Sequence, residues 1–404
     1  MESVTLDDIE AAAARIAPVV RRTPTVESRV LSDRVGAPVL LKCENLQRTG
    51  SFKPRGAYNR IANLSADERA RGVVAASAGN HGQGVAWAAT ELGTASTVFM
   101  PLGASLPKLV ATRAYGADVH QVGHTVDEAL IAAREFADRT GATLIHPFDH
   151  PDIVAGQGTV ALEILEQVPD VATVVVPTGG GGLLAGVAAA MHALAPHVRV
   201  IGVQAADAAA WPSSLAAGAP TALPKMATMA DGIAVGLPGA VPFAEVAALG
   251  TEIVTVDEDA LAKALVLSLE RAKLVVEPAG AAGVAALLTH AIPNLEGPVV
   301  AILSGGNIDP LLLTRVIGHG LSAGGRYLEL RVTIADRPGA LSALLAVVGA
   351  AEASVVDVSH SRTASTLAVD EVEVSLTLET RGPAHRDEVL KTLRDAGFGV
   401  RAEP

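Results

Sequence analysis

Lys53 is the residue most suited to chemistry, because its neighbours in the stretch 51–57 (Ser-Phe-Lys-Pro-Arg-Gly-Ala) are mostly small or apolar. Such surroundings can desolvate an amine, which lowers its pKa and leaves a neutral nucleophile for a carbonyl group. The alternative is a solvated lysine in a surface loop, which is the commoner situation for this residue type. The stretch by itself favours the surface lysine, and three other stretches reverse that preference.

The first of them is a run of four glycines between an apolar run and a helical pattern. The residues are Gly179, Gly180, Gly181 and Gly182, with Leu183 directly after them. Backbone N–H groups that no side chain shields, together with a helix N-terminus, make a site suited to phosphate. A dinucleotide fingerprint would instead require an acidic residue about 20 residues further on. Gln204 stands near that position and is neutral, so the glycines favour a single phosphate group.

The other two stretches, 77–81 and 304–307 (Ser-Gly-Gly-Asn), also follow apolar runs. A lysine that can react with a carbonyl group, a phosphate-binding loop and these two further loops together predict a site for pyridoxal phosphate. Lys53 would hold the aldehyde of this cofactor, the glycines its phosphate, and Ser304 would face its pyridine nitrogen. Asn80 would hydrogen-bond the ring hydroxyl, and Phe52 would pack either on the cofactor or in the core.

The elements that must position these loops alternate between strand and helix. Helices are expected at 5–16, 55–64, 82–92, 106–115, 126–140, 154–167 and 183–194, and strands at 38–42, 73–76, 96–101, 118–122, 143–145, 173–177, 199–204 and 298–303. Short connections between such elements are the signature of a parallel sheet. The candidate loops follow four of the strands, where open α/β sheets bind ligands. The loop 146–151 separates two groups of units, which predicts two α/β lobes facing each other.

The composition changes near residue 318, and a tail of strand and helix patterns follows. Its strands are expected at 327–334, 353–359, 371–379 and 399–401, and its helices at 340–350 and 385–396, which gives the order βαββαβ. We therefore expect a catalytic domain at 1–318 whose small lobe, at about 43–145, is inserted in the large lobe. A linker at 319–325 and a small α+β domain at 326–404 would complete the chain.

The composition excludes several classes of protein. The net charge is −12 and no block of lysine and arginine is present, so binding to nucleic acid or to a membrane surface is not expected. No apolar run reaches the ~18–20 residues of a membrane span. The acidic start lacks a signal-peptide core, and Cys43 is the sole cysteine, which excludes an intramolecular disulfide. These features predict a soluble cytoplasmic protein, with Cys43 in its core.

Several long motifs, in the same order along residues 5–318, resemble the threonine dehydratase (threonine ammonia-lyase) family of fold-type II pyridoxal-phosphate enzymes, which are similar to tryptophan synthase β. The motifs lie at 51–57, 77–86, 150–159, 179–182 and 304–307. The resemblance implies two parallel-sheet lobes around the cofactor. The tail, with Asp-Arg-Pro-Gly-Ala-Leu at 336–341, resembles an ACT domain, a small regulatory module that binds ligands.

The resemblance implies a β-elimination that converts L-threonine to 2-oxobutanoate and ammonia, and L-serine to pyruvate. Lys53 would remove the α-proton after the substrate has displaced it from the cofactor. The substrate carboxylate would be held by the loop Ser77, Ala78, Gly79, Asn80 and His81. A hydroxyl at Ser304, unlike a carboxylate, would not keep the pyridine nitrogen protonated, which favours elimination over transamination. The ACT-like tail implies a homo-oligomer, a tetramer or a dimer, with isoleucine or valine as effector, and the role stays open between isoleucine biosynthesis and threonine catabolism.

Alternatives remain at several positions. A serine racemase or a β-replacing enzyme of the same fold type is one, although related racemases have a second serine where this chain has Ala78. A non-catalytic amino-acid sensor built on the ACT-like tail is another. No metal site is expected, because His146 and His150 lie in a proline-broken loop and Gln204 replaces an acidic ligand of some relatives. Arg55 is interpreted as a surface charge, and Glu277 either lies near the cofactor or starts a helix.

Overall fold

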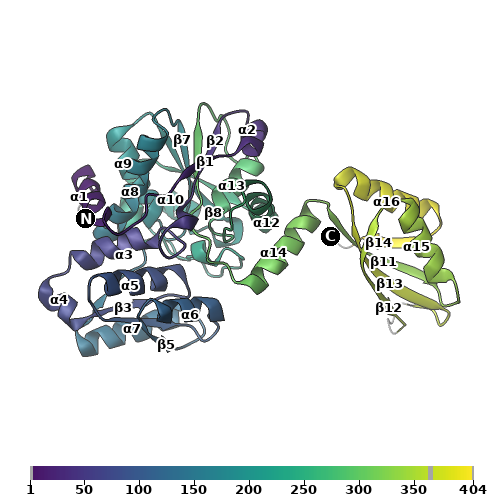
Figure 1. Ribbon diagram of the computed structural model, residues 1–404, viewed down its shortest axis with the longest axis horizontal. Helices are drawn as coiled ribbons and strands as arrows, with labels where there is room; N and C mark the ends of the chain where they lie inside the picture. Colours follow the sequence, from purple (N-terminus) through teal and green to yellow (C-terminus); the bar gives the residue numbers. More distant parts are fainter. Residues whose placement is uncertain (1–2, 363–366, 403–404) are drawn as a thin grey trace. The chain divides into compact units, whose positions relative to one another are not determined.

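The computed structural model describes residues 3–362 and 367–402, and the chain divides into two units, Met1–Leu313 and Thr314–Pro404 (Figure 1). The first unit contains two sheets. Its larger sheet has the order β1-β2-β10-β7-β8-β9, formed by Thr25–Glu27, Val39–Lys42, Val299–Ile302, Thr173–Pro177, Arg199–Ala205 and Glu252–Val256. Neighbouring strands are parallel except β1, which pairs antiparallel with β2.

The smaller sheet of the first unit has the order β5-β4-β3-β6, and all of its pairs are parallel. Its strands are Asp118–Gln121, Ser96–Met100, Val73–Ala76 and Thr143–Leu144. The two parallel-sheet lobes expected from the sequence are therefore confirmed. Among the described residues, no helix is both long and apolar enough to cross a membrane.

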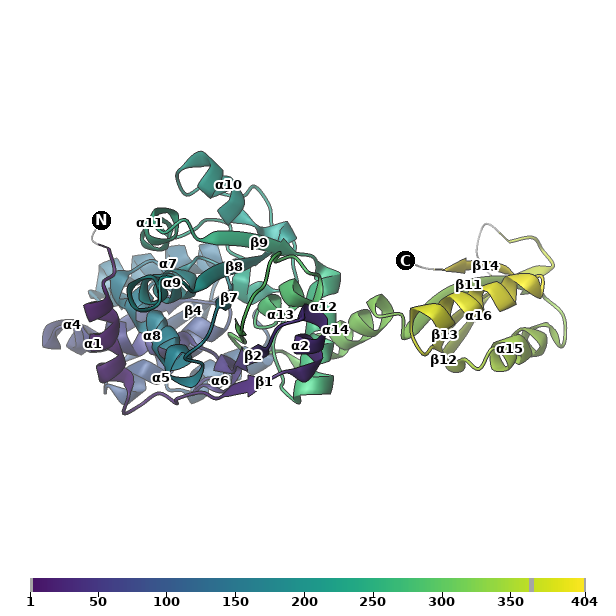
Figure 2. The ribbon, with the colours of Figure 1, turned by 90° about the horizontal axis from the view of Figure 1, so that it is seen from above.

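Helices cover both faces of the larger sheet. In Figures 1 and 2, α8 (Pro151–Gln167) and α9 (Gly182–Leu194) lie on one side of β7, and α12 (Glu258–Leu267) and α13 (Ala282–Leu288) lie on the other. Successive side chains of a strand point to opposite faces, so Val174 and Val176 pack in the core with α8 and α9 while Val175 contacts α13. Burial on both faces explains why these strands are continuous apolar runs rather than alternating ones.

Glycines bring the helices behind the site into close contact. A Cβ on Gly156 of α8 would lie 2.6 Å from the Cα of Gly56 in α3 (Lys53–Ala62), and a Cβ on Gly186 of α9 would lie 2.3 Å from the carbonyl oxygen of Val154. No side chain fits at these contacts. The helix that carries Lys53 is therefore packed backbone against backbone onto α8 of the large lobe.

The remaining helices of the first unit are α1 (Leu6–Ile16), α2 (Arg29–Val35), α4 (Ala66–Arg71), α5 (Asn80–Glu91), α6 (Leu106–Ala114), α7 (Val126–Thr140), α10 (Ala210–Ala217) and α11 (Ala240–Ala248). Thr5 caps α1 in a capping box with Asp8, as its position predicts. The sequence had indicated no elements for α10, α11, β9, α12 and α13.

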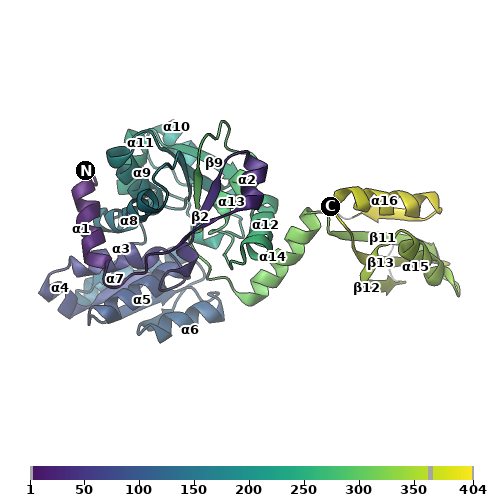
Figure 3. The same cartoon turned by 45° about the horizontal axis from the view of Figure 1, so that its top comes forward.

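The second unit contains a four-stranded antiparallel sheet of order β12-β13-β11-β14, formed by Ser354–Ser361, Glu371–Glu379, Tyr327–Ala335 and Gly399–Ala402. Its helices α15 (Ala340–Ala350) and α16 (Pro383–Asp395) share one core with alternate residues of β11 and β13 (Figure 3). The βαββαβ order is thus confirmed. Residues 319–323, expected in a linker, are the last residues of α14 (Pro310–Ala323).

Candidate functional site

The candidate loops meet at one edge of the larger sheet. The strands β2, β10 and β7 are adjacent and parallel, so their carboxyl ends lie side by side. The segment leading to Lys53 follows β2, residues 304–307 follow β10, and the four glycines follow β7. Adjacent parallel strands therefore bring together three stretches that are far apart in the sequence.

Backbone contacts join the lysine stretch to the loop after β10. The N–H of Phe52 donates to the carbonyl of Ser304 at 3.1 Å, and the N–H of Gly306 donates to the carbonyl of Gly50 at 2.8 Å. Ser51 and Gly305 form an isolated β-bridge between these bonds. Lys53 and Ser304 are thus held in neighbouring positions by the main chain. The hydroxyl-bearing Ser304 is only 4% exposed.

Lys53 is the first residue of α3 and its side chain is half-buried, so the surface-loop interpretation is wrong. Its Nζ donates to the carbonyl of Pro147 at 2.9 Å and lies 5.1 Å from the centre of the Phe52 ring. Burial lowers the pKa of the Lys53 ammonium to about 8, against an opposing contribution from the negative charge of Glu277. A substantial fraction of this amine is therefore neutral in mildly alkaline water.

The glycine loop is enclosed by aromatic rings. A Cβ on Gly180 would lie 2.4 Å from ring atoms of Phe148, and one on Gly181, whose φ is +101°, would lie 2.2 Å from Trp211. The indole N–H of Trp211 donates to the carbonyl of Gly179 at 2.7 Å. Helix α9 begins at Gly182, so the N–H groups of its first turn lack acceptors within the helix. Leu183 lies buried in this first turn.

Residues 147 and 148 connect Lys53 to the glycine loop. Pro147 accepts the hydrogen bond of the lysine, and the next residue, Phe148, covers Gly180 and Gly182. The amine and the N–H-rich helix terminus thus border the same short segment. This arrangement supplies a carbonyl-reactive group and an anion-binding group at one site.

The loop 77–81 follows β3 of the smaller sheet. The hydroxyl oxygen of Ser77 accepts from the N–H of Gly79 at 3.0 Å, Ala78 is half-buried, and Asn80 begins α5. The Nε2 of His81 lies 2.8 Å from the carbonyl oxygen of Ile145, so this nitrogen carries the donated proton. Burial, and then the charge of Lys53, lower the pKa of His81 to about 3. His81 is therefore a neutral, buried side chain of the loop.

Glu277 is a site residue that sequence reasoning left undecided. Its Oε1 accepts from the Nδ2 of Asn80 at 2.5 Å, while the Oδ1 of Asn80 accepts from the Nδ2 of Asn307 at 2.8 Å. Burial, and then the charge of Asp231, raise the pKa of Glu277 to about 7. The carboxylate lies beside Asn80 instead of capping α13, whose cap is Ala281. The Glu-Pro-Ala-Gly stretch was the available signal, and it also fitted a helix start.

Arg55 is 1% exposed, so its interpretation as a surface charge is wrong. Its guanidinium donates two hydrogen bonds of 2.8 Å to Glu44 and one of 2.7 Å to Glu163 of α8. Lys42 donates to the other oxygen of Glu163 at 2.5 Å. A charge can be buried here because every ion has a partner. The cluster fixes α3, two residues after Lys53, to α8 and β2.

The histidines after β6 are held by local hydrogen bonds, as expected. The Nδ1 of His146 accepts from the N–H of Asp149 at 2.9 Å, and that of His150 accepts from the N–H of Asp152 at 3.1 Å. Burial lowers the pKa of His146 to about 4. Over residues 3–362 and 367–402, no group of three or more histidine, cysteine, aspartate or glutamate side chains is placed to hold a metal ion. Cys43 is buried in the core, as predicted.

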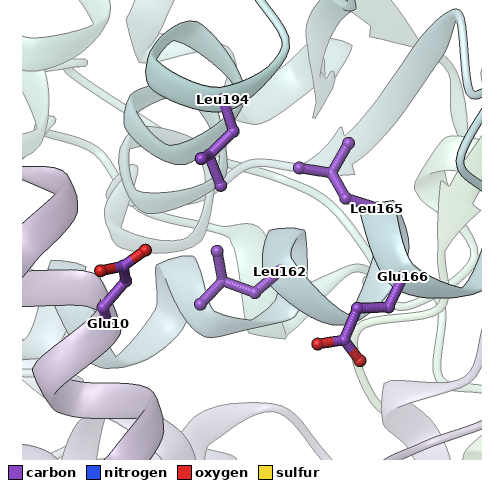
Figure 4. A pocket seen from close by; sticks show the side chains of 5 residues that line it. All are labelled: Glu10, Leu162, Leu165, Glu166 and Leu194. Carbon is purple, nitrogen blue, oxygen red and sulfur yellow. The ribbon is translucent and has the colours of Figure 1, made fainter.

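A separate pocket of about 330 Å³ lies between α1, α8 and α9 (Figure 4). It is lined by Glu10, Leu162, Leu165, Glu166 and Leu194. None of the candidate site residues lines it, so its walls provide neither the amine nor the anion-binding loop described above.

The donor set fits the pyridoxal phosphate expected from the sequence. The site offers an amine of lowered pKa at Lys53, an N–H-rich loop at a helix N-terminus and a nearly buried hydroxyl at Ser304. Three buried polar atoms of the site residues, Ser51 Oγ, His81 Nδ1 and Glu277 Oε2, have no hydrogen-bond partner among the described residues. Buried polar atoms of this kind are normally satisfied, so a polar ligand at this site would meet groups that still require partners.

Comparisons with known proteins support pyridoxal phosphate as the cofactor. The family model "Pyridoxal-phosphate dependent enzyme" matches residues 16–305. An L-threonine ammonia-lyase of Geobacter sulfurreducens is 46% identical over 392 residues, which cover 97% of this chain and 98% of that protein. A solved structure of a T.th. threonine deaminase is 43% identical with a TM-score of 0.72, covering 76% of this chain and 99% of that one.

A solved structure of maize serine racemase is also similar, with 35% identity, a TM-score of 0.75, and coverage of 80% of this chain and 99% of that one. The two solved structures cover about three quarters or more of this chain, and the Geobacter protein matches nearly all of it. Since the family model spans most of the chain and this relative matches along its full length, the chain belongs to the pyridoxal-phosphate-dependent enzymes and, among them, to the family of the L-threonine ammonia-lyases.

Proposed function

We propose that this protein is an L-threonine ammonia-lyase that converts L-threonine to 2-oxobutanoate and ammonia, and L-serine to pyruvate. The observation that carries the proposal is the amine of Lys53, whose pKa is lowered to about 8 beside a glycine loop at a helix N-terminus. The near full-length match to an L-threonine ammonia-lyase supports threonine as the substrate. A cytoplasmic location belongs to the same proposal.

Pyridoxal phosphate, when bound, supplies an aldehyde that condenses with amino groups and a ring that withdraws electrons from the carbon next to the nitrogen. We assign Lys53 to the aldehyde and Gly179, Gly180, Gly181, Gly182 and Leu183 to the phosphate. Ser304, Asn80 and Phe52 would contact the ring. A hydroxyl at Ser304, unlike a carboxylate, would not keep the ring nitrogen protonated, which would favour loss of a β-substituent over transamination.

Lys53 then acts on the substrate as a base. An amine with a pKa of about 8 is partly neutral near neutral pH, so it can take the α-proton without first losing its own proton to water. The N–H groups and side chains of the loop 77–81 would hold the substrate carboxylate, because α5 begins there and leaves donors without acceptors. His81 is neutral and already bonded to Ile145, so it would shape this loop rather than exchange protons.

Racemisation is the second candidate, since the structure of maize serine racemase is similar to this chain. A racemase must return a proton to the face of the α-carbon opposite the lysine. Ala78 is half-buried in the carboxylate-binding loop and carries no proton that it could donate. The side chain at this position therefore favours elimination over racemisation.

The test is release of 2-oxo acids from L-threonine and L-serine by the wild-type protein and by Lys53→Ala, each with pyridoxal phosphate added. We expect 2-oxobutanoate from the wild type and a loss of at least about 10³-fold in the variant, because both the attachment and the base are removed. Formation of D-serine from L-serine without oxo acid would support the racemase. No product with the cofactor bound would reject both enzymes.

The second unit has the strand and helix order of an ACT-like module, and we assign it a regulatory role with isoleucine or valine as effector. An effect of isoleucine would indicate the biosynthetic role. The edge strand β12 exposes Val355, Val356 and Val358, and an unpaired edge of this kind can pair with a second copy. We therefore expect a homo-oligomer, a dimer or a tetramer. If neither isoleucine nor valine changes the activity curves or the melting temperature, the proposed effector is wrong. If the protein sediments as a monomer, the proposed oligomer is wrong.

A further inference from the structure

An ion pair joins the two lobes of the first unit next to the loop 77–81. The Nζ of Lys108, on α6 of the smaller lobe, lies 2.5 Å from the Oδ2 of Asp231. Asp231 begins a short 3₁₀ turn, Asp231–Ile233, between β8 and β9 of the larger lobe. The pair connects residues that are 123 positions apart in the sequence.

Each partner also borders a part of the candidate site. A Cβ on Gly79 would lie 3.1 Å from Cδ and 3.4 Å from Nζ of Lys108, so the ammonium lies over the loop 77–81. On the other side, a Cβ on Gly232 would lie 3.5 Å from Oε1 of Glu277, and one on Gly179 would lie 3.1 Å from the Cα of Ile233. The pair therefore lies between the loop proposed to hold the carboxylate and the loop proposed to hold the phosphate.

The two charged side chains differ in their access to water. The side chain of Lys108 is 12% exposed, whereas that of Asp231 is 50% exposed. Leaving the charge of a largely buried lysine side chain without a partner costs more than returning a half-exposed carboxylate to water. An incoming carboxylate could therefore replace Asp231 at Lys108, with one ion pair broken and one formed.

We propose that Lys108 is a further substrate-positioning residue, whose ammonium binds the α-carboxylate of the amino-acid substrate and gives up Asp231 when the substrate enters. The proposal rests on the proposed function, because it takes the loop 77–81 as the carboxylate site. It adds a cation to a loop that otherwise offers only uncharged donors. Asp231 holds this cation in place over the loop and competes with the substrate for it.

Two variants separate this role from that of a structural tether. Lys108→Met should raise the KM for L-threonine about 10- to 100-fold with a smaller change in kcat, the range expected for one lost hydrogen bond to a charged group. Asp231→Asn should leave the KM unchanged or lower it, because the competing carboxylate is gone. A tether would behave differently, since both variants break the same ion pair and both would then raise the KM alike.

Binding without turnover gives an independent measurement. L-alanine has the carboxylate of the substrate but no β-hydroxyl to lose, so its dissociation constant can be titrated through the absorbance of the bound cofactor. Lys108→Met should weaken L-alanine about 10- to 100-fold and leave L-alaninamide, which lacks the carboxylate, unchanged. Lys108→Arg should restore most of the affinity, and Lys263→Met on α12 is the control for loss of a half-buried lysine.

The outcomes distinguish this inference from the proposed function. If the wild type releases no 2-oxo acid, the proposed function fails, and the alanine titration still reports on Lys108. If the wild type is active but Lys108→Met binds L-alanine as well as the wild type does, the inference on Lys108 is wrong. Equal weakening of L-alanine and L-alaninamide would also overturn it, because the lost interaction would then not involve the carboxylate.

Discussion

Replacing Arg55 by methionine tests whether the buried ion cluster holds the helix of Lys53 in place. Arg55 is 1% exposed and donates two hydrogen bonds to Glu44, which is fully buried, and one to Glu163. Arg55→Met keeps most of the volume but leaves the Glu44 carboxylate without its main cation. Removing one partner of a buried pair costs about 3–5 kcal/mol, and we expect a loss of this size in the free energy of unfolding of the first unit.

The loss should depend on pH in a defined direction. Burial alone would raise the pKa of Glu44, but the charge and hydrogen bonds of Arg55, together with the charge of Lys42 and a hydrogen bond from Thr23, outweigh it and hold the pKa below its usual value. Without Arg55, burial dominates and the pKa of Glu44 in the folded variant rises above its value in the unfolded chain. The folded variant then takes up a proton at a higher pH than the unfolded chain does, so it gains stability as the pH falls through the raised pKa. The deficit should therefore shrink as the pH falls from the raised pKa of Glu44 toward the ordinary glutamate value of about 4.3.

The assay is urea unfolding of the cofactor-free proteins, followed by tryptophan fluorescence. Both tryptophans of the chain, Trp87 and Trp211, lie in the first unit and are buried, so the signal reports on that unit. Omitting the cofactor removes the stabilisation that ligand binding would add. The control is Arg60→Met on the same helix, which breaks the more exposed pair with Asp152 and should cost at most about 1 kcal/mol.

Three results would refute this reasoning. A loss below about 1 kcal/mol for Arg55→Met would mean that the cluster contributes no more than a surface ion pair. A deficit that stays constant or grows on acidification would mean that Glu44 does not become the unpaired buried charge. Equal losses for Arg55→Met and Arg60→Met would show that any change on α3 is equally harmful.

Three further predictions concern the cofactor site. Cofactor-free protein should bind pyridoxal phosphate faster as the pH rises past about 8, because Lys53 then becomes neutral. Stopped-flow absorbance measures this rate. A rate that rises only at about pH 10, the ordinary range for lysine, would contradict the lowered pKa of Lys53. In Glu277→Gln the midpoint of this rise should move to lower pH, because the charge of Glu277 raises the pKa of Lys53; an unchanged midpoint would place Glu277 too far away to matter. Gly180→Ala should weaken cofactor binding about 5- to 150-fold, because its Cβ would lie 2.4 Å from the Phe148 ring and overpacking costs about 1–3 kcal/mol. Equilibrium titration measures this effect, Phe148→Leu in the same chain should recover part of it, and unchanged binding would show that the loop moves freely.

The strands and loops of the site could be predicted because their signals are local. Residues 73–76 and 173–177 are short apolar runs that end at small residues, and the structure has strands with these same bounds. The helix 126–140 was equally clear, since Thr125 caps it and Gly141 ends it in the left-handed conformation. Where capping residues and glycines mark the ends of helices and strands, the sequence is sufficient to locate the loops that follow those helices and strands.

No elements were expected in the segment 206–294, and two of its helices lack such contrast, whereas α12 begins with a capping Asp257 and two acidic residues, a signal that the prediction missed. Helix α11 is largely apolar and α13 is almost entirely buried, so neither has the polar face that makes a helical period visible. The strand β9 is only five residues long and lies at the edge of the larger sheet. The pair Lys108–Asp231 depends on this segment, and sequence spacing alone could not have brought these residues together.

The burial of the charged residues at the site also could not be predicted from the sequence. Arg55, Glu277 and Lys108 all stand in stretches that permit a surface position, and each is mostly removed from water by a partner more than 100 residues away: Glu163, Asn80 and Asp231. The fold decides whether such a charge is buried, because a charged side chain is tolerated in the interior only where an oppositely charged or hydrogen-bonding partner is placed beside it. Two of these residues, Arg55 and Glu277, act on Lys53 from different sides. Arg55 fixes the start of its helix, and Glu277 opposes the desolvation that frees its amine. The reactivity of Lys53 is therefore a property of the assembled lobes, and a variant that leaves residues 51–57 intact can still change it.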